Sequence, residues 1–519
     1  MNTKPEEFDY LVIGAGSAGC AVAGRLSEDA ETEVALIEAG PSDHHSIFRI
    51  PAKFWQQQKS SFDWDFETEP EAGLGGRRTY LPRGRVLGGT SSMNTMLYVR
   101  GSASDYDEWA ARGCEGWGYE DVLPLFRRSE DNSRGEDRFH GVGGPLAVVD
   151  VDRVPELLRR WVAAAEQAGH PANPDFNGAE QDGVGIYQST QREGRRCSSA
   201  SAFITPNLGR PNLSVFASTQ ALRILWDENM RAIGMQVEWC GSVRTLYARR
   251  EVIVCAGAYL SPQLLMVSGV GPAEHLDELG IPVVVDNPAV GENLQDHPGC
   301  FLTYLARPGF EHEARTWVEA GGFARSRPEL SRPDIQFHAA AGSFGDDGVA
   351  TTGVNAISFG PYVARPRSRG RVRLRSDLPQ AKPRIWHNFL SEPEDVIVLR
   401  EGLSMAMRIA EQPSLAETLE PIEVSREAGL IPRSESDRDI DAHMREQAFS
   451  FYHPVGTCAI GSVVDSDLAV IGVDGLRVCD ASVMPTLIGG NTNAPAIMIG
   501  EKLAQSLAPA GASLGVPAT

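Results

Sequence analysis

Short apolar runs and a helical pattern alternate at the start of the chain. Residues 10–13 are uninterruptedly apolar, residues 18–26 are rich in Ala and other small residues with a helical period, and residues 34–40 (VALIEAG) begin with a second apolar run. Continuous apolar runs of this length are typical of strands that are buried in a parallel sheet. The pattern therefore predicts a strand, a helix and a second strand, as in a Rossmann-type βαβ unit.

Three glycines occupy the predicted turn between strand and helix, in the spacing Gly14-x-Gly16-x-x-Gly19. Gly14 allows a tight turn, Gly16 lets the backbone approach a pyrophosphate, and Gly19 lets the helix pack closely on the strand. The helix N-terminus offers free N–H groups to the phosphates. Glu38 lies 19 residues beyond Gly19, where a carboxylate accepts hydrogen bonds from ribose hydroxyls. These features predict dinucleotide binding, and Glu38 disfavours NADP without separating NAD from FAD.

Later segments have a different pattern of apolar and polar positions. Residues 213–259 alternate apolar and polar positions between turn residues, which predicts strands and hairpins that end in a buried strand, EVIVCAGA. Residues 356–376 predict strands of a largely antiparallel sheet, and residues 392–412 have helical spacing. We therefore predict an α/β protein (α+β overall), with a Rossmann-type FAD- or NAD-binding domain and a substrate-binding domain that contains a mainly antiparallel sheet and helices.

Composition narrows the function classes. The 519 residues carry a formal net charge of −21, which argues against nucleic acid as a main partner because phosphate binding needs a basic face. No stretch approaches 18 uninterrupted apolar residues, so no transmembrane segment is expected. No basic region followed by an apolar run opens the chain, so no secretory signal is expected. None of the eight cysteines falls in a C-x-x-C pair, which favours a reducing compartment and a cytoplasmic location.

A glycine-rich loop occupies residues 83–109, RGRVLGGTSSMNTMLYVRGSASDYDEW. Its glycines and small polar residues would bring many backbone N–H groups to a flat polar ligand. A Gly/Ser surface loop is the alternative, but this loop contains residues that are too apolar for exposure to water: Met93, Met96, Leu97 and Tyr98. The loop therefore favours a ligand-binding role.

This loop resembles the first signature of the glucose–methanol–choline oxidoreductases, and looks most like their choline dehydrogenase branch. The matching residues are Gly84-Arg85, Leu87-Gly88-Gly89-Thr90-Ser91, Met93-Asn94, Tyr98, Gly101 and Asp107. Further stretches are similar to other motifs of the family, in family order: residues 257–271, 291–297 and 475–504. The resemblance covers most of the chain and implies FAD, bound across discontinuous segments. It implies an FAD-binding domain of residues 1–155, 196–300 and 450–519, and a substrate-binding domain of residues 156–195 and 301–449.

The resemblance also implies which residues bind FAD. Ala221 takes the position whose backbone meets the adenine half, and Asp480-Ala481 would meet the ribityl and pyrophosphate, although a structural Asp at a strand end is the alternative. Met93 stands where some relatives carry a histidine that bonds covalently to the flavin, so noncovalent FAD is expected. The full expected set is Gly14, Gly16, Ser17, Ala18, Gly19, Glu38, Ala39, Arg85, Leu87, Gly88, Thr90, Asn94, Thr95, Met96, Leu97, Ala221, Asp480, Ala481, Asn491 and Pro495.

His453 lies in the segment FSFYHPVGTC, and its role has three interpretations. A metal ligand is disfavoured, because only Cys458 is close and His443 is the one other histidine within twenty residues; no metal is expected. A packed core histidine is the ordinary alternative. Pro454 disfavours helical backbone at the preceding residue. His453 should therefore lie on a rigid extended or turn segment among aromatic residues, which suits a proton acceptor.

The segment GGNTNAPAIMIGEKLA at 489–504 supplies the second expected catalytic residue. Asn493 precedes Ala494 and Pro495, and Asn is a favoured N-cap whereas Pro favours the first turn. A buried helix that starts here would present positive potential to the negative charge that reduced flavin acquires. In the family, the His of HPVGT and the second Asn of NTN form the catalytic pair, which the resemblance places at His453 and Asn493.

The implied function is FAD-dependent oxidation of an alcohol to an aldehyde or ketone. His453 would take the hydroxyl proton as hydride leaves the carbon for flavin N5, and the electrons would then pass to oxygen or to a separate acceptor. The alternative is a hydroxynitrile-lyase-like enzyme on the same flavoprotein scaffold. The resemblance implies choline as a candidate substrate. Binding of its quaternary ammonium needs aromatic faces near the site. Core packing explains the candidate aromatic residues equally well: Phe451, Tyr452 and Trp317. The oligomeric state stays open.

Overall fold

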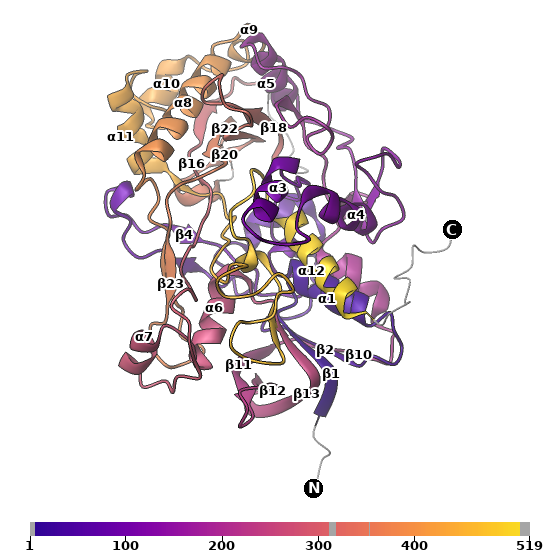
Figure 1. The fold of residues 1–519 in the computed structure, drawn as a ribbon. Helices are drawn as coiled ribbons and strands as arrows, with labels where there is room; N and C mark the ends of the chain where they lie inside the picture. The colour runs from indigo at the N-terminus through magenta and orange to yellow at the C-terminus, as the bar shows by residue number, and fades with distance from the viewer. Residues whose placement is uncertain (1–5, 311–317, 352, 509–519) are drawn as a thin grey trace.

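The structure is a computed structural model that describes residues 6–310, 318–351 and 353–508 (Figure 1). Two seven-stranded sheets organise these residues. One contains β1, β2 and β10–β13 and lies at the bottom of the view in Figure 1; the other contains β16, β18 and β22 and lies near the top. The predicted mixed α/β architecture is confirmed.

The first sheet has the strand order β10-β2-β1-β13-β12-β11, and β26 also pairs with β13. Its parallel strands are β1 (Glu6–Ile13), β2 (Val34–Ile37), β10 (Leu213–Phe216), β13 (Ser242–Val254) and β26 (Leu476–Val478). The hairpin partners β11 (Thr219–Trp226) and β12 (Ala232–Trp239) run antiparallel. The predicted Rossmann-type sheet, with its added hairpins, is therefore present.

Helix α1 (Ser17–Leu26) follows β1 and packs against α12 (Asn493–Leu507), which lies beside it in Figure 1. Small residues make this packing close. A Cβ atom on Gly19 would lie 2.0 Å from the carbonyl oxygen of Gly14, and one on Gly500 would lie 2.6 Å from that of Ala18. Gly19 thus has its predicted packing role. In the same way, the missing side chain of Gly500 allows α12 to pack closely on α1.

The second sheet is antiparallel and has the order β25-β16-β22-β19-β18-β7, with β17 beside β22. Its strands are β7 (Gly183–Ile186), β16 (Pro298–Gly299), β17 (Leu302–Leu305), β18 (Val318–Ala324), β19 (Ile335–Ala341), β22 (Ala356–Val363) and β25 (Phe449–Ser450). Helices α5 (Glu156–Gln167) and α8 (Pro393–Ala410) pack on it. The predicted antiparallel sheet and the helix at 392–412 are confirmed.

One expected strand lies elsewhere. Residues 356–376 were expected to belong to one antiparallel sheet, but only β22 does so. β23 (Arg371–Arg373) instead forms a separate two-stranded ladder with β24 (Arg384–Trp386). The reason lies in packing, because Val372 and Ile385 of this ladder are buried against Tyr259 and Leu294 rather than against the second sheet.

The two short strands β16 and β25 pair with each other at one edge of the second sheet. The expected division at 300/301 and 449/450 would assign β16 to the FAD-binding part and would cut β25 in two. In the structure both strands belong to the antiparallel sheet. His297 immediately precedes β16 and His453 follows β25 by three residues, so this edge of the sheet carries two histidines.

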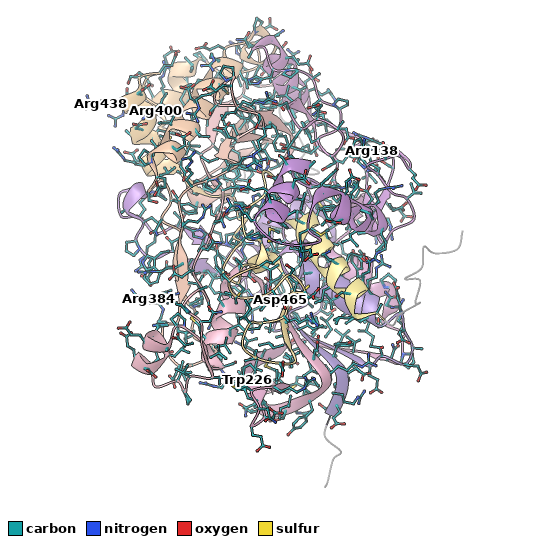
Figure 2. The ribbon with its side chains drawn as sticks, viewed as in Figure 1. Arg138, Trp226, Arg384, Arg400, Arg438 and Asp465 are labelled. Carbon is teal, nitrogen blue, oxygen red and sulfur yellow. The ribbon has the colours of Figure 1, made fainter. Side chains whose placement is uncertain are left out.

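The helices on the outer side of the second sheet carry charged side chains. Arg400 of α8 contacts Asp441 of α11 (Asp437–Gln447) at 2.8 Å, and Figure 2 shows Arg400 and Arg438 on the outer side of this layer. Among the described residues, no helix is long and apolar enough to cross a membrane. All eight cysteines are free, and every one except Cys240 is buried.

Candidate active site

One cavity extends from the ends of β1 and β2 to aromatic side chains of the second sheet. It brings together most of the residues that the sequence predicts for the site. Those that line it are Gly14, Gly16, Ser17, Ala18, Glu38, Ala39, Thr90, Asn94, Thr95, Met96, Leu97, Ala221, His453, Asp480, Ala481, Asn491 and Asn493. The motifs at 14–39, 83–97 and 449–496 therefore meet around a single space.

Five expected FAD-binding residues lie behind the wall of this cavity: Gly19, Arg85, Leu87, Gly88 and Pro495. Their surroundings explain why. The guanidinium of Arg85 lies over the ring of Trp64, 5.3 Å from its centroid, and the amide of Gly88 donates to the carbonyl of Ala15 at 2.7 Å. These residues hold the lining segments in place rather than forming the surface of the cavity.

The N-terminus of α1 opens into the cavity without a side-chain cap, and Gly16 is its N-cap residue. A Cβ atom on Gly16 would meet no protein atom within 4 Å, because that direction is cavity space. The first amides of a helix have no partner inside the helix and carry partial positive charge. An open, uncapped helix start of this kind fits a pyrophosphate.

Glu38 lies beside this helix start at the end of β2. Its carboxylate accepts hydrogen bonds from the amides of Ala15 at 3.0 Å and Gly40 at 2.8 Å. Burial raises the pKa of Glu38 to about 7, and these two hydrogen bonds act in the opposite direction. The carboxylate lines the cavity next to the phosphate-binding turn, as a ribose-binding acid must, so the residues present fit a dinucleotide such as FAD.

A second uncapped helix start faces the same cavity. Thr492, not Asn493, is the N-cap of α12, and no side chain caps the helix. Asn493 is the first helical residue, and its Oδ1 accepts a hydrogen bond from the Ser17 hydroxyl at 2.7 Å. The expectation of an Asn493 cap is therefore corrected by one residue. Asn493 instead ties the start of α12 to the start of α1.

The partner of His453 is Asn491 rather than Asn493. His453 Nε2 lies 3.1 Å from Asn491 Nδ2, and both residues line the cavity. The difference arises from where α12 begins, because Asn491 lies before the helix and can reach the histidine. Asn493 is already helical and points to α1. The expected pairing of His453 with Asn493 is thus replaced in the structure by a contact between His453 and Asn491.

Side chains of the second sheet orient the Asn491 amide. Asn491 Oδ1 accepts a hydrogen bond from Gln336 Nε2 at 3.0 Å, and Gln336 Oε1 accepts one from the Tyr362 hydroxyl. Because the amide oxygen is occupied by a donor, the Nδ2–H groups of Asn491 face His453 and the cavity. The site therefore presents an oriented donor beside the ring of His453.

His297 contacts the other side of the His453 ring, with 3.0 Å between the two Nδ1 atoms. Asp296 holds both backbones, because its Oδ1 accepts from the amides of His297 and His453 at 2.8 Å each. The backbone of Tyr452 has a φ of 68°, and its amide donates to the Ser450 hydroxyl at 2.8 Å. His453 lies on a non-helical segment, as predicted.

Burial lowers the pKa of His453 well below its ordinary value. The nearby His297, His338 and Arg83 lower this pKa further, because they disfavour another positive charge. His453 is therefore neutral at pH 7 and available as a proton acceptor. Among the described residues, no group of three or more His, Cys, Asp or Glu side chains is placed to hold a metal ion.

Asp480 lines the cavity, but its carboxylate is engaged within the protein. One oxygen accepts from the Gly257 amide and the Ser261 hydroxyl, and the other accepts from the Ser482 amide at 2.8 Å. These bonds fix the start of α6 (Gly257–Val267) next to Asp480. These bonds give the side chain a structural role, and Asp480 also lines the cavity as expected for a residue near the cofactor.

The chain matches a known protein family over most of its length. The family model described as GMC oxidoreductase matches residues 8–299 with its N-terminal part and residues 366–500 with its C-terminal part. The chain is a GMC oxidoreductase. FAD is the cofactor of this family, and the Gly14–Gly19 turn and Glu38 provide the surroundings that such a dinucleotide requires.

Relatives at nearly full length agree with this assignment. This GMC oxidoreductase is 40% identical to an oxygen-dependent choline dehydrogenase from Sinorhizobium fredii, over 96% of this chain and 95% of that protein. Among solved structures it resembles pyridoxine 4-oxidase from Mesorbium loti, with 31% identity, a TM-score of 0.89 and coverage of 96% and 99%. It also resembles an Aspergillus oryzae formate oxidase studied for FAD modification, with 25% identity, a TM-score of 0.87 and coverage of 97% and 98%.

The family and these relatives establish an FAD-dependent oxidoreductase that acts on CH–OH donors. They give no support to the lyase alternative. Three further residues lie around the pair of His453 and Asn491 without having been predicted from the sequence: His297, Gln336 and His338. His297 ends the matched motif GENLQDH at residues 291–297, so a signal for it was present. Gln336 and His338 lie on β19, where nothing but strand periodicity is visible.

Proposed function

We propose that this GMC oxidoreductase oxidises an alcohol to an aldehyde or ketone with His453 as the base and Asn491 as its partner. The observation that carries this proposal is a buried, neutral imidazole whose Nε2 faces an oriented amide donor in the cavity. FAD, when bound, supplies the acceptor for the hydride that leaves the alcohol carbon. The base and the donor come from the protein.

The roles of the two side chains follow from their chemistry. An alcohol oxygen that contacts both groups would pass its proton to His453 Nε2 and would accept a hydrogen bond from Asn491 Nδ2. The amide donor then stabilises the negative charge that grows on the oxygen as the proton leaves. Asn491 cannot take the proton itself, because its Nδ2 carries only donors.

The residues proposed to hold FAD can be grouped by the part of FAD that each would bind. The N-terminus of α1 receives the pyrophosphate, Glu38 accepts from the ribose hydroxyls, and Ala221 lies with Glu38 along the same stretch of cavity. The N-terminus of α12 adds positive potential near His453, which suits a group that gains electrons. The division into domains at 1–155, 196–300 and 450–519 against 156–195 and 301–449 remains a proposal, with β16 and β25 shared at the edge of the substrate-binding part.

FAD is expected to be held without a covalent bond. Met93 lines the cavity at the place where some relatives carry the attached histidine, and a thioether has no proton to lose and forms no such bond under ordinary conditions. Acid precipitation should therefore release all of the yellow colour into the supernatant. Flavin that stays with the precipitated polypeptide would contradict noncovalent binding.

We further propose that the substrate is an alcohol with an apolar or aromatic body. The cavity beyond His453 is walled by Phe54, Phe301, Phe344, Phe449 and Phe451. The ring centroids of Phe301 and Phe451 lie 5.2 Å apart. Among the described residues that line the cavity, the carboxylates are Glu38 and Asp480, and neither lies on this wall. An uncharged body therefore fits the wall without an unpaired charge.

A choline-type cation is the second candidate substrate. The 40% identical choline dehydrogenase and the aromatic faces of Phe451 and Tyr452 favour it, because aromatic rings attract a quaternary ammonium. Trp317, which was named as a further aromatic candidate, lies outside the described residues. We also propose a cytoplasmic location, for which the eight free thiols give support.

Anaerobic mixing tests the reaction and the substrate class together. Holoenzyme is mixed with aryl alcohols, primary alkanols, choline and a sugar, and flavin absorbance is followed. Bleaching supports alcohol oxidation, and faster bleaching by aryl alcohols than by choline supports the apolar substrate class. Product without bleaching would restore the lyase alternative, and no bleaching by any alcohol would refute the proposal. Reoxidation by oxygen, compared with a dye, then identifies the kind of electron acceptor.

A further inference from the structure

His297 lies between the ring of His453 and two backbone carbonyl groups. Its Nε2 atom lies 3.1 Å from the carbonyl oxygen of Ala364 and 3.2 Å from that of Ile488. Carbonyl oxygens only accept hydrogen bonds, so Nε2 of His297 must carry a hydrogen. The two carbonyls follow β22 and precede α12, and thus come from both halves of the molecule.

The protonation state of the other ring nitrogen of His297, Nδ1, follows from the charge of the imidazole. His297 is completely buried, and burial lowers its pKa to about 3. A neutral imidazole has one hydrogen, which here is on Nε2, so Nδ1 of His297 carries a lone pair. This lone pair lies 3.0 Å from His453 Nδ1. The contact is a hydrogen bond only if His453 donates from Nδ1.

The same hydrogen bond determines the free nitrogen of His453. A neutral His453 with its hydrogen on Nδ1 has its lone pair on Nε2, which faces the Asn491 amide donor and the cavity. The other tautomer would set two lone pairs against each other at Nδ1 and two N–H groups against each other at Nε2. Both contacts of His453 therefore agree on one tautomer, the one in which Nε2 can accept a proton.

We infer that His297 is a positioning residue that holds His453 in the tautomer in which Nε2 is the base. The inference rests on the proposed function, in which His453 takes the hydroxyl proton. After proton uptake at Nε2, His453 still donates from Nδ1 to His297, so the hydrogen bond between the two histidines does not have to rearrange during the reaction. Asp296 supports the arrangement because it accepts from the amides of both histidines.

Two substitutions of His297 separate this role from simple packing. In His297→Asn, Oδ1 takes the approximate place of Nδ1 and can still accept from His453, but the amide is too short to donate to both carbonyls. In His297→Gln, the Nε2–H groups can reach the carbonyls of Ala364 and Ile488, but a methylene replaces the acceptor. His297→Asn thus retains the acceptor for His453, whereas His297→Gln retains the donor to the two carbonyls.

The experiment measures the rate of anaerobic flavin reduction at saturating alcohol, with flavin content and thermal midpoint as controls of folding. We expect His297→Gln to be slowed on the order of 10²-fold, within the up to about 10⁴-fold cost of a wrong tautomer. His297→Asn should recover most of this loss and stay within about tenfold of the parent. A slow Asn variant beside a fast Gln variant, or equal rates in both, would overturn the inference.

A direct measurement covers the case in which a variant does not fold. Nitrogen-15 labelling of histidine in the unaltered holoenzyme distinguishes protonated from unprotonated ring nitrogens, and the His453→Ala variant assigns the signal of His453. The expected result is N–H at Nδ1 and a lone pair at Nε2; the reverse overturns the inference. The proposed function fails separately, if His453→Ala retains full flavin reduction by alcohol.

Discussion

Gly16→Val should give a folded protein that has lost essentially all of its FAD. The side-chain direction at residue 16 is open, with no protein atom within 4 Å of an added Cβ atom, so the polypeptide tolerates the change. The space that valine occupies is the space at the start of α1 through which the pyrophosphate must approach. The measurement is the ratio of flavin to protein absorbance after purification, with circular dichroism to show the fold.

Two other glycines serve as controls for this prediction. Gly209→Val introduces the same side chain at another position with no atom within 4 Å, away from the cavity, and should retain FAD. Gly19→Ala should instead destabilise the protein, because its Cβ would lie 2.0 Å from a backbone oxygen. If Gly16→Val folds and keeps its full flavin content, the start of α1 is not the phosphate site.

His453→Ala should keep FAD but lose turnover by on the order of 10²- to 10⁴-fold, the usual contribution of a positioned base. Its flavin should be reduced by dithionite yet bleached only slowly by alcohol, which separates a lost base from a lost fold. Asn491→Ala should lose less, since the amide orients the oxygen and takes no proton. Normal turnover in His453→Ala, or loss of FAD with unfolding, would make His453 a packing residue.

The pH dependence of the parent carries the same information. Protonation of His453 removes the base, so kcat/KM should fall as the pH decreases. Because burial lowers the pKa of His453, this fall should be centred below the ordinary histidine value of about 6.5, and activity should be flat from there through neutral pH. The acid limb should be absent in His453→Ala. A limb centred above 6.5 would contradict a buried, depressed base.

Local features of the sequence were enough to predict the dinucleotide-binding end of the site. The strand, the turn and the helix of the fingerprint are contiguous, and their roles depend on short-range geometry, such as the approach of Gly19 to Gly14. Glu38 lies only 19 residues further along. The antiparallel second sheet and its helix at 392–412 could also be predicted, because the spacing of apolar positions and the length of the segments distinguish strands from helices. The separate ladder of β23 and β24 was not, because burial against Tyr259 decides it.

The reacting end depends on contacts between distant segments, and the sequence predicted it less well. Asn491 and Asn493 are two residues apart and chemically identical, and only the exact start of α12 decides which of them reaches His453. His297 lies 156 positions from His453, and Gln336 lies 155 from Asn491. No periodicity in the chain links such positions. The three-dimensional pairing of β16 with β25 brings the two histidines together.

That pairing has a consequence for how proteins of this architecture diversify. The proposed base His453 and its neighbour His297 are attached to the edge of the antiparallel sheet, through the strands β16 and β25, rather than to the Rossmann-type sheet. A chimera that exchanged only residues 301–449 would combine Phe301, Phe344 and Phe449 of one parent's aromatic wall with His297 and His453 of the other parent. With His453 as the proposed base, we expect that recombination changes the substrate without misaligning the base only if both short strands are carried across, that is, if about residues 297 to 453 are exchanged together.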